Sequence, residues 1–337
     1  MLVDPACIPS SERTMTTSTA FTDLTTSLPF PLPRIKGPKL EPFRGTADVE
    51  LEFIRYIGNE DDLDSKVWKV KVDDKYYALK VFPFQYWVGL KKTSGRWIIA
   101  PEYDDEGRPP LTPQDYLDYL DPFHNECRVY GRLKQENHED IAVRAHGYVL
   151  LTPEQEKFVT EACGPEYIDP KTAEELDGQA LWFRRESNRH DRLRAILKDF
   201  VPEETPDFDK SQISQMYEDM ETLHSLGILI RDINPKNYLG GKLIDFSRSW
   251  TMYHPCLDRT SWKGLCKLRI AEVRSFVDMV FNWAVHHETK ITVPEKLLEW
   301  GGDLEGCGIN PYDYDWRKWE EEEEEEAICD EHNERPS

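Results

Sequence analysis

A pair of adjacent glycines, Gly240 and Gly241, separates two short runs, NYL and KLIDF, and limits how the chain can fold at that point. Because glycine accepts positive φ at little cost, such a pair is typical of a two-residue β-hairpin turn. The hairpin would bring Asn237, at the start of one strand, and Asp245, at the end of its partner, to the same end. Asp232 lies in the loop just upstream, and we expect it at that end as well.

These three side chains carry the oxygen atoms that suit Mg²⁺, which takes few carboxylates and leaves positions for phosphate oxygens. Two charged residues in the first half of the chain complete the set. Lys80 lies in the expected strand KYYALKVF, and Glu126 lies on the apolar face of an expected helix that begins at Asp121-Pro122. A carboxylate on an apolar helix face needs a partner.

Hydrophobic periodicity predicts a strand-rich first half with one main helix, followed by a helix-rich second half. This is a two-lobed α+β arrangement. The expected strands cover 49–58, 65–72, 75–82, 141–151 and 193–201, and helices are expected at 122–135, 213–226 and over most of 250–300. Gly227 is expected to end the helix before it. The predicted organisation is a disordered leader over 1–40, an N-lobe over 41–201 with inserts at 83–121 and 152–192, a helical C-lobe over 202–316 and an acidic disordered tail over 317–337.

The order of these motifs resembles the protein-kinase fold. LHSLGILIRDINPKNYL resembles the end of a long helix running into the kinase catalytic loop, LIDFS resembles the metal-binding Asp-Phe-Gly, and YYALKVF resembles the strand with the phosphate-contacting lysine. The resemblance implies binding of ATP and Mg²⁺. It implies Asp232 as catalytic base, Asn237 and Asp245 as metal ligands, Lys80 on the phosphates with Glu126 holding it, and a hinge at 198–201 whose Asp199 and Val201 face the adenine.

A narrower resemblance is to the fungal kinase-like family named for the Fta-two subunit of the Sim-four inner-kinetochore complex. The segments that carry it are GPKLEPF, DPFHNECRVYGRL and RDINPKNYLGGKLIDFSRSW. This resemblance implies a fungal source and a kinase-like domain.

Departures from the kinase pattern at four places bear on activity. The expected glycine-rich loop is replaced by NEDDLD at 59–64, whose four carboxylates would repel a triphosphate if they point inward. Ile230 replaces the usual histidine, and Ser247 replaces the glycine of Asp-Phe-Gly, which restricts the backbone there. Asn234 replaces a lysine that steadies the transferring phosphoryl group.

The net charge of −22 argues against direct binding to DNA or RNA, because a phosphate backbone would be repelled. Residues 320–337 carry ten acidic residues and one arginine, so the tail or the inserts are the expected contacts for a protein partner. Seven scattered cysteines fit a reducing compartment, and neither a membrane-spanning run nor a signal pattern is present. We therefore expect an intracellular protein of the nucleus or cytoplasm.

Two functions follow from the kinase resemblance. The first is an atypical kinase-fold phosphotransferase that moves the ATP γ-phosphoryl group to an acceptor hydroxyl. The second is a pseudokinase scaffold, such as an inner-kinetochore subunit, with little or no catalysis. The five polar positions favour the first function, and the acidic loop and tail favour the second.

Overall fold

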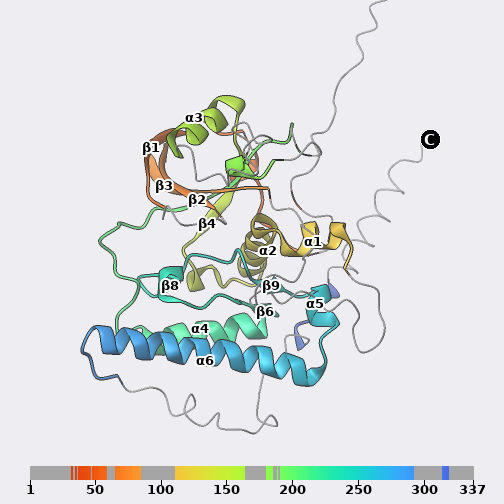
Figure 1. The fold of residues 1–337 in the computed structure, drawn as a ribbon, viewed down its shortest axis with the longest axis vertical. Coiled ribbons are helices and arrows are strands. Elements are labelled where there is room, and N and C mark those ends of the chain that lie inside the picture. Colours follow the sequence, from red (N-terminus) through yellow and green to blue (C-terminus); the bar gives the residue numbers. More distant parts are fainter. Residues whose placement is uncertain are drawn as a thin grey trace, which may run out of the picture. The chain divides into compact units, whose positions relative to one another are not determined.

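The computed structural model describes residues 32, 35, 37–46, 48–58, 65–84, 111–163, 180–184, 188, 190–291 and 313–318. The chain divides into two units, Met1–Pro31 and Leu32–Ser337, and every described residue belongs to the second. The acidic loop at 59–64, most of the insert at 83–121 and the acidic run at 320–326 lie outside the described residues. The fold is α+β, as predicted, with an antiparallel sheet and a helical layer (Figure 1).

Five antiparallel strands form the sheet in the order β1-β2-β3-β5-β4. Their bounds are Glu52–Tyr56 (β1), Lys66–Val72 (β2), Lys75–Phe82 (β3), Ala145–Leu150 (β4) and Arg194–Asp199 (β5). β2 and β3 form the predicted hairpin, with Asp73 at a φ of 52° in its turn. Because side chains alternate along a strand, each strand offers one set to each face of the sheet.

One face of the sheet is apolar and packs against helix α3 (Pro153–Cys163). Trp68, Val70 and Leu79 of β2 and β3 form a buried cluster there with Val159 of α3 and with Trp182. Trp182 belongs to the 3-10 helix η4 (Ala180–Trp182), so α3 and η4, which both lie in the insert at 152–192, contribute to the core. Figure 1 shows α3 lying against the first strands of the sheet.

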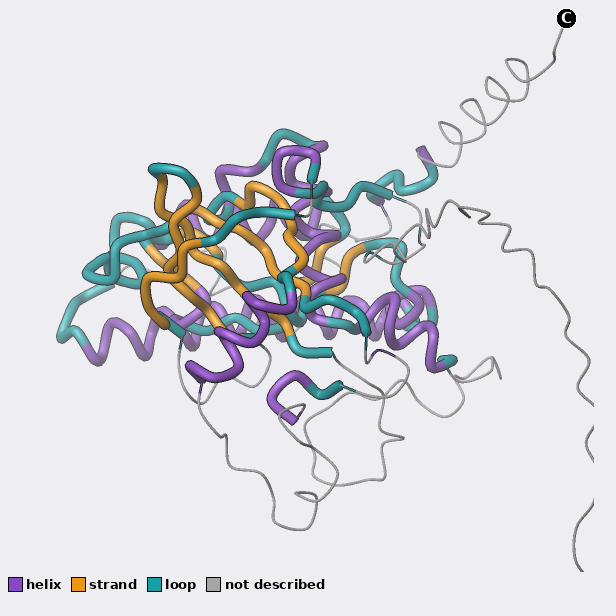
Figure 2. Tube along the Cα trace, turned by 90° about the horizontal axis from the view of Figure 1, so that it is seen from above, coloured by secondary structure: helices purple, strands orange, loops and turns teal. Residues whose placement is uncertain are grey.

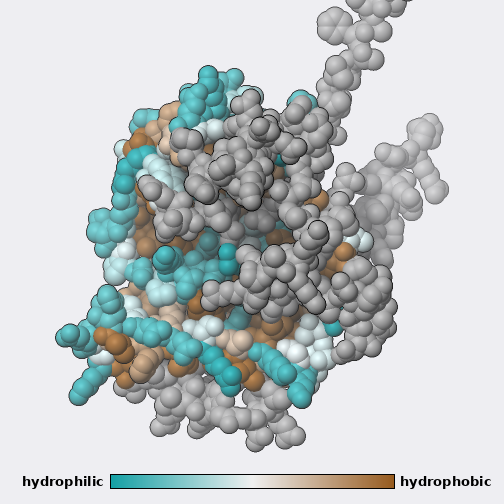
Figure 3. All heavy atoms as spheres, in the orientation of Figure 1, coloured by the Kyte–Doolittle hydropathy of each residue, from teal (hydrophilic) through white to brown (hydrophobic). Residues whose placement is uncertain are grey.

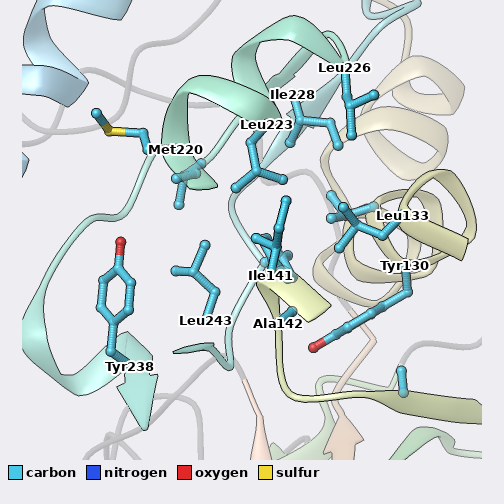
Figure 4. Packing of buried hydrophobic residues seen from close by; sticks show 14 of the residues in the cluster. Tyr130, Leu133, Ile141, Ala142, Met220, Leu223, Leu226, Ile228, Tyr238 and Leu243 are labelled. Atoms are coloured by element: carbon cyan, nitrogen blue, oxygen red, sulfur yellow. The ribbon is translucent and has the colours of Figure 1, made fainter. Parts of the chain in front are cut away.

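Helix α2 (Pro122–Gln135) connects the sheet to the helical layer. It begins where Asp121-Pro122 predicts, and its residues join a second buried cluster with α4 (Ile213–Ser225) and α6 (Trp262–His286). Figure 4 shows Tyr130 and Leu133 of α2 on one side of Ile141 and Ala142, with Leu223 of α4 and Leu243 on the other side. The cluster therefore fixes α2 between the two layers.

In the helical layer, α4 and α6 lie side by side, with the rings of Tyr217 and Phe276 5.9 Å apart (Figure 1). Figure 2 looks down on the strands, which overlie this layer. Gly227 follows α4 with a φ of 70°, as predicted for a residue that ends a helix. The remaining elements are α1 (Pro113–Leu120), α5 (Pro255–Asp258), the pair β6 (Ile228–Leu229) and β9 (Trp250–Thr251), the pair β7 (Tyr238–Leu239) and β8 (Lys242–Leu243), and the 3-10 helices η1 (Phe43–Gly45), η2 (Glu139–Ile141) and η6 (Pro235–Asn237).

Packed structure extends N-terminal to residue 41, where the sequence places the end of the leader. Leu40 is buried, and its N–H donates to the Cys127 carbonyl of α2 at 2.8 Å. On the outer surface, Figure 3 shows hydrophobic patches among hydrophilic residues along α6, where Phe281 and Val285 are exposed. Among the helices of the described residues, none combines the length and apolar character needed to span a membrane.

Candidate functional site

Lys80 of β3 and Glu126 of α2 form the ion pair that the sequence predicts. Both side chains are buried, and the Lys80 Nζ bonds Oε1 of Glu126 across 46 residues of sequence. Lys80 lies opposite Val67 on one neighbouring strand and Ile196 on the other, so its cross-strand neighbours are both apolar. A charge buried in such surroundings is stable only when it is paired, and Glu126 provides that pair.

The start of α2 is held in place by Asp121, and this fixes where Glu126 lies. The Asp121 carboxylate caps the helix by accepting the N–H groups of Phe123 and His124 at 3.0 and 3.2 Å. It also pairs with the guanidinium of Arg194 on β5 at 3.0 Å. Burial would raise the pKa of Asp121, but the Arg194 charge holds it below its ordinary value. The cap and the ion pair together anchor α2 to the sheet.

A second buried lysine, Lys198 of β5, shares Glu126 with Lys80. Its Nζ donates to Oε2 of Glu126 at 2.6 Å and to the Ile244 carbonyl at 2.7 Å. The hinge assignment of 198–201 did not predict this contact. The sequence does hold a signal for this contact. Lys198 directly follows the apolar residues 195–197 of β5, and a buried lysine there needs a carboxylate partner.

Asp245 completes this charged cluster. Its Oδ1 lies 2.7 Å from the Lys80 Nζ and accepts the Ser247 N–H at 2.8 Å. Burial would raise the pKa of Asp245, but the charges of Lys80 and Lys198 hold it well below its ordinary value. Burial would likewise lower the pKa of Lys80, and Asp245 and Glu126 raise it instead. Both groups are therefore charged at neutral pH.

The hairpin and its preceding loop place Asp232 beside Asn237, as expected. The Asn237 amide donates to the Asp232 backbone carbonyl at 2.8 Å, and the Asn234 amide donates to the Asp232 carboxylate at 3.1 Å. The turn residues Gly240 and Gly241 take φ values of 58° and 77°, as predicted. The Asn237 carbonyl accepts the Ile244 N–H at 2.9 Å, so Asn237 lies next to the strand that leads into Asp245.

The residue before Asp232 has a strained backbone that α6 supports. Arg231 takes a φ of 68°, and its N–H donates to Oε1 of Glu272 at 2.6 Å. Glu272 also bonds the ring of His224 on α4 at 2.7 Å. The Arg231 guanidinium lies over the Trp250 ring at 3.7 Å. Ile230, which replaces the usual kinase histidine, is buried in the core as its apolar side chain requires.

The predicted hinge residues lie at the end of β5. The Asp199 carboxylate accepts from Lys75 at 3.1 Å and contacts the His146 ring at 2.8 Å. Burial would raise the pKa of Asp199, but these two partners lower it. Val201 is half-buried just beyond the strand. Because the Asp199 side chain is engaged by the sheet, its expected contact with adenine would have to come from the backbone, and this contact stays a prediction.

Helix α2 is fastened to the segment that follows Asp245 by three side chains on one face. Asn125 donates to the Ser247 carbonyl at 2.9 Å, and Arg128 donates to the Thr251 and Tyr253 carbonyls at 2.8 and 2.6 Å. Arg132, one turn further on, donates to the Leu226 and Met252 carbonyls. Burial lowers the pKa of Arg128 to about 10. These bonds were not predicted, because their acceptors are backbone carbonyls, which no residue type in the sequence marks.

The side-chain oxygens of Asn237 and Asp245 supply part of a coordination site for Mg²⁺. Asn237 uses its amide nitrogen on the Asp232 carbonyl, which leaves its side-chain oxygen as an acceptor, and Asp245 is ionised with one oxygen on Lys80. Mg²⁺ is commonly held by one or two such protein oxygens together with substrate phosphates. No group of three or more His, Cys, Asp or Glu side chains in the described part of the chain is arranged to hold a metal by itself.

Residues 28–250 match the family model described as kinetochore Sim4 complex subunit FTA2. The chain belongs to this family. The matched range contains every predicted site residue, from Lys80 to Asp245, together with Lys198 and the three α2 residues that hold the following segment. No curated protein matches the chain. The matched range thus covers the sheet, helix α2 and the hairpin that build this site.

Proposed function

We propose that the chain is a kinase-like subunit of a kinetochore assembly and that its charged site binds a nucleoside triphosphate with Mg²⁺. The family description names a subunit of the kinetochore Sim4 complex, which supports a nuclear protein that acts with protein partners. The observation that carries the nucleotide site is the Lys80–Glu126 pair beside Asp245. Kinases require a strand lysine paired with a helix glutamate and an aspartate in place for the metal.

Within this proposal, Lys80 pairs with the α- and β-phosphates, and Asn237 and Asp245 hold Mg²⁺. The metal would supply positive charge against the charge that develops on the phosphates. Asp232 would orient an acceptor hydroxyl and take its proton as the acceptor oxygen bonds the γ-phosphorus and the bond to ADP breaks. The Asn234 amide, 3.1 Å from the Asp232 carboxylate, supports this role because it keeps that carboxylate oriented.

A second candidate function, a scaffold without phosphoryl transfer, is favoured by a different observation. The two lysines and two carboxylates of the site satisfy one another, so the cluster is stable without a ligand. Such a cluster can join sheet, α2 and hairpin into a rigid surface for protein partners. In this case the site residues contribute to stability alone.

Thermal unfolding of the full chain with and without Mg-ATP separates the two. A ligand that binds only the folded state stabilises it by about 2.7 kcal/mol at a hundredfold excess over Kd. A nucleotide-binding site therefore gives a clear rise in melting temperature. If the melting temperature does not rise at millimolar Mg-ATP, the result favours the scaffold function. Where binding is seen, Asp232→Asn should retain the rise but lose any transfer of the γ-phosphoryl group.

A further inference from the structure

Lys198 lies in the charged cluster without a role in the nucleotide site proposed above. Its Nζ contacts Oε2 of Glu126 at 2.6 Å, while Lys80 contacts Oε1 of the same carboxylate. We propose that Lys198 is a positioning residue that keeps Glu126 paired when a phosphate group draws Lys80 away, and so allows the site to accept the charged part of a nucleotide. This inference rests on the proposed nucleotide function.

The geometry of the sheet explains why two lysines meet at one carboxylate. Lys198 pairs with Ala78, two residues before Lys80 on β3, so both lysines project from the same face of adjacent strands. Like charges placed in this way repel each other. Glu126, which α2 brings to the same face, offers one oxygen to each lysine. The arrangement therefore depends on all three residues.

The charges of the cluster balance. Asp245 contacts Lys80, Lys80 contacts Glu126, and Glu126 contacts Lys198. Lys198 also donates to the Ile244 carbonyl and lies 4.9 Å from the centre of the Tyr130 ring. Two positive charges meet two negative charges. Without Lys198, Lys80 would be the single cation shared by two carboxylates, and it could not turn to a third anion without leaving one of them unpaired.

Binding of a phosphate brings such a third anion to Lys80. A phosphate oxygen that bonds the Lys80 Nζ competes with the bonds to Glu126 and Asp245. Glu126 is fully buried, and a buried carboxylate that loses its partner carries a large desolvation cost. The bond from Lys198 removes that cost, so Lys80 can be shared with the ligand. A neutral ligand does not compete with Glu126 and Asp245 for Lys80.

A purely structural role for Lys198 is the alternative. In that role its bond to the Ile244 carbonyl fixes the backbone before Asp245, and its charge toward Glu126 does not matter for binding. The two roles predict different effects of a change at Lys198 when the charge at position 126 is removed. If Lys198 compensates the charge of Glu126, loss of Lys198 weakens Mg-ATP binding only when position 126 carries a carboxylate.

The test is a mutant cycle read by the Kd of the full chain for two probes, Mg-ATP and adenosine. Lys198→Met should weaken Mg-ATP binding by at least about tenfold, because Glu126 would then lose its partner when Lys80 turns to the phosphate. The same variant should leave adenosine binding unchanged. Lys198→Arg, which keeps the charge, should stay within about threefold of the wild type. In the Glu126→Gln background, adding Lys198→Met should change Mg-ATP binding by less than about threefold.

Several results would overturn the inference. These are an equal loss for adenosine and Mg-ATP, a failure of Lys198→Arg to restore binding, or an equal effect of Lys198→Met with and without Glu126. Should Lys198→Met alone not fold, Glu126→Gln and Glu126→Gln/Lys198→Met still give the deciding comparison, because neither leaves Glu126 charged and unpaired. Absence of Mg-ATP binding by the wild type overturns the nucleotide site itself, and this inference with it.

Discussion

The Lys80 ammonium lies 2.7 Å from the Asp245 carboxylate, which also accepts the Ser247 N–H at 2.8 Å. The residue proposed to hold the metal is therefore paired with the residue proposed to hold the phosphates. In the proposed nucleotide complex, Asp245 would hold Mg²⁺ and Lys80 would pair with the phosphates, so this pair would have to rearrange. A change at Asp245 is expected to affect both stability and binding.

Asp245→Asn keeps the size of the side chain and removes its charge. The apo protein should lose about 2 kcal/mol of unfolding free energy, because a charge-assisted hydrogen bond to Lys80 is lost. Urea unfolding measures this loss. The stabilisation by Mg-ATP should disappear, since a metal ligand is gone. A variant that Mg-ATP stabilises as well as the wild type would show that Asp245 does not hold the metal.

His254 predicts a pH dependence of stability. It is fully buried, its Nδ1 accepts the Cys256 N–H at 3.2 Å, and its Nε2 donates to the Tyr119 carbonyl at 2.9 Å. This bonding requires the neutral ring. Burial, reinforced by the charges of Arg128 and Arg231, holds the pKa of His254 well below its ordinary value.

Because the folded pKa of His254 is depressed, the unfolded state binds the extra proton first. Its contribution to stability is complete above the unfolded pKa, about 6.5, and falls by up to about 1.4 kcal/mol per pH unit below it. Urea unfolding between pH 7.5 and 5.5 measures the slope. His254→Asn keeps a cap acceptor and should show a smaller slope by this amount. Equal slopes in the two proteins would mean that His254 does not titrate on unfolding.

The Asp121–Arg194 pair should contribute more than the helix cap alone. Asp121→Asn keeps a good N-cap residue but leaves the buried Arg194 unpaired, and it should cost about 3–5 kcal/mol. The double variant Asp121→Asn/Arg194→Met removes the unpaired charge and should recover most of this loss. Denaturant unfolding of the wild type and the two variants measures how much of the loss is recovered. A double variant no more stable than Asp121→Asn would show that the unpaired Arg194 charge does not cause the loss.

The hairpin turn gives a matched pair of glycine variants. Gly241 has a φ of 77°, and an added Cβ would lie 3.0 Å from the Gln212 side chain. Gly241→Val should therefore cost about 2–3 kcal/mol, since a β-branched residue is strained in this region. Gly240 has a φ of 58° and 3.5 Å of clearance to Thr205, so Gly240→Asn should cost less than about 1 kcal/mol. Similar melting temperatures for the two variants would argue against the strained turn.

Local patterns in the sequence predicted much of the fold and part of the site. The helix start at Asp121 follows from capping chemistry, and the glycine turn follows from φ preferences. The pairing of Lys80 with Glu126 was expected from the resemblance to the kinase fold. Lys198 was missed because its partner comes from a distant helix, and β5 reads equally well as an apolar strand that ends in a polar residue.

Other features have weaker signals in the sequence. Arg128 and Arg132 bond backbone carbonyls, which every residue provides, so their targets depend on how α2 packs against 251–253. Helix α3 lies in a polar insert, where few apolar residues such as Val159 mark the buried face. In each case the missing information is tertiary. The partner is set by which elements meet, and local periodicity does not determine that.

Calorimetric titration of Mg-ATP into the full chain tests whether the Lys80–Glu126–Asp245 cluster is a nucleotide site. The wild type should bind at a single site, and Lys80→Met, which removes the phosphate-contacting charge, should bind at least about tenfold more weakly. No binding heat for the wild type at millimolar Mg-ATP, or equal affinity in the two proteins, would contradict the claim.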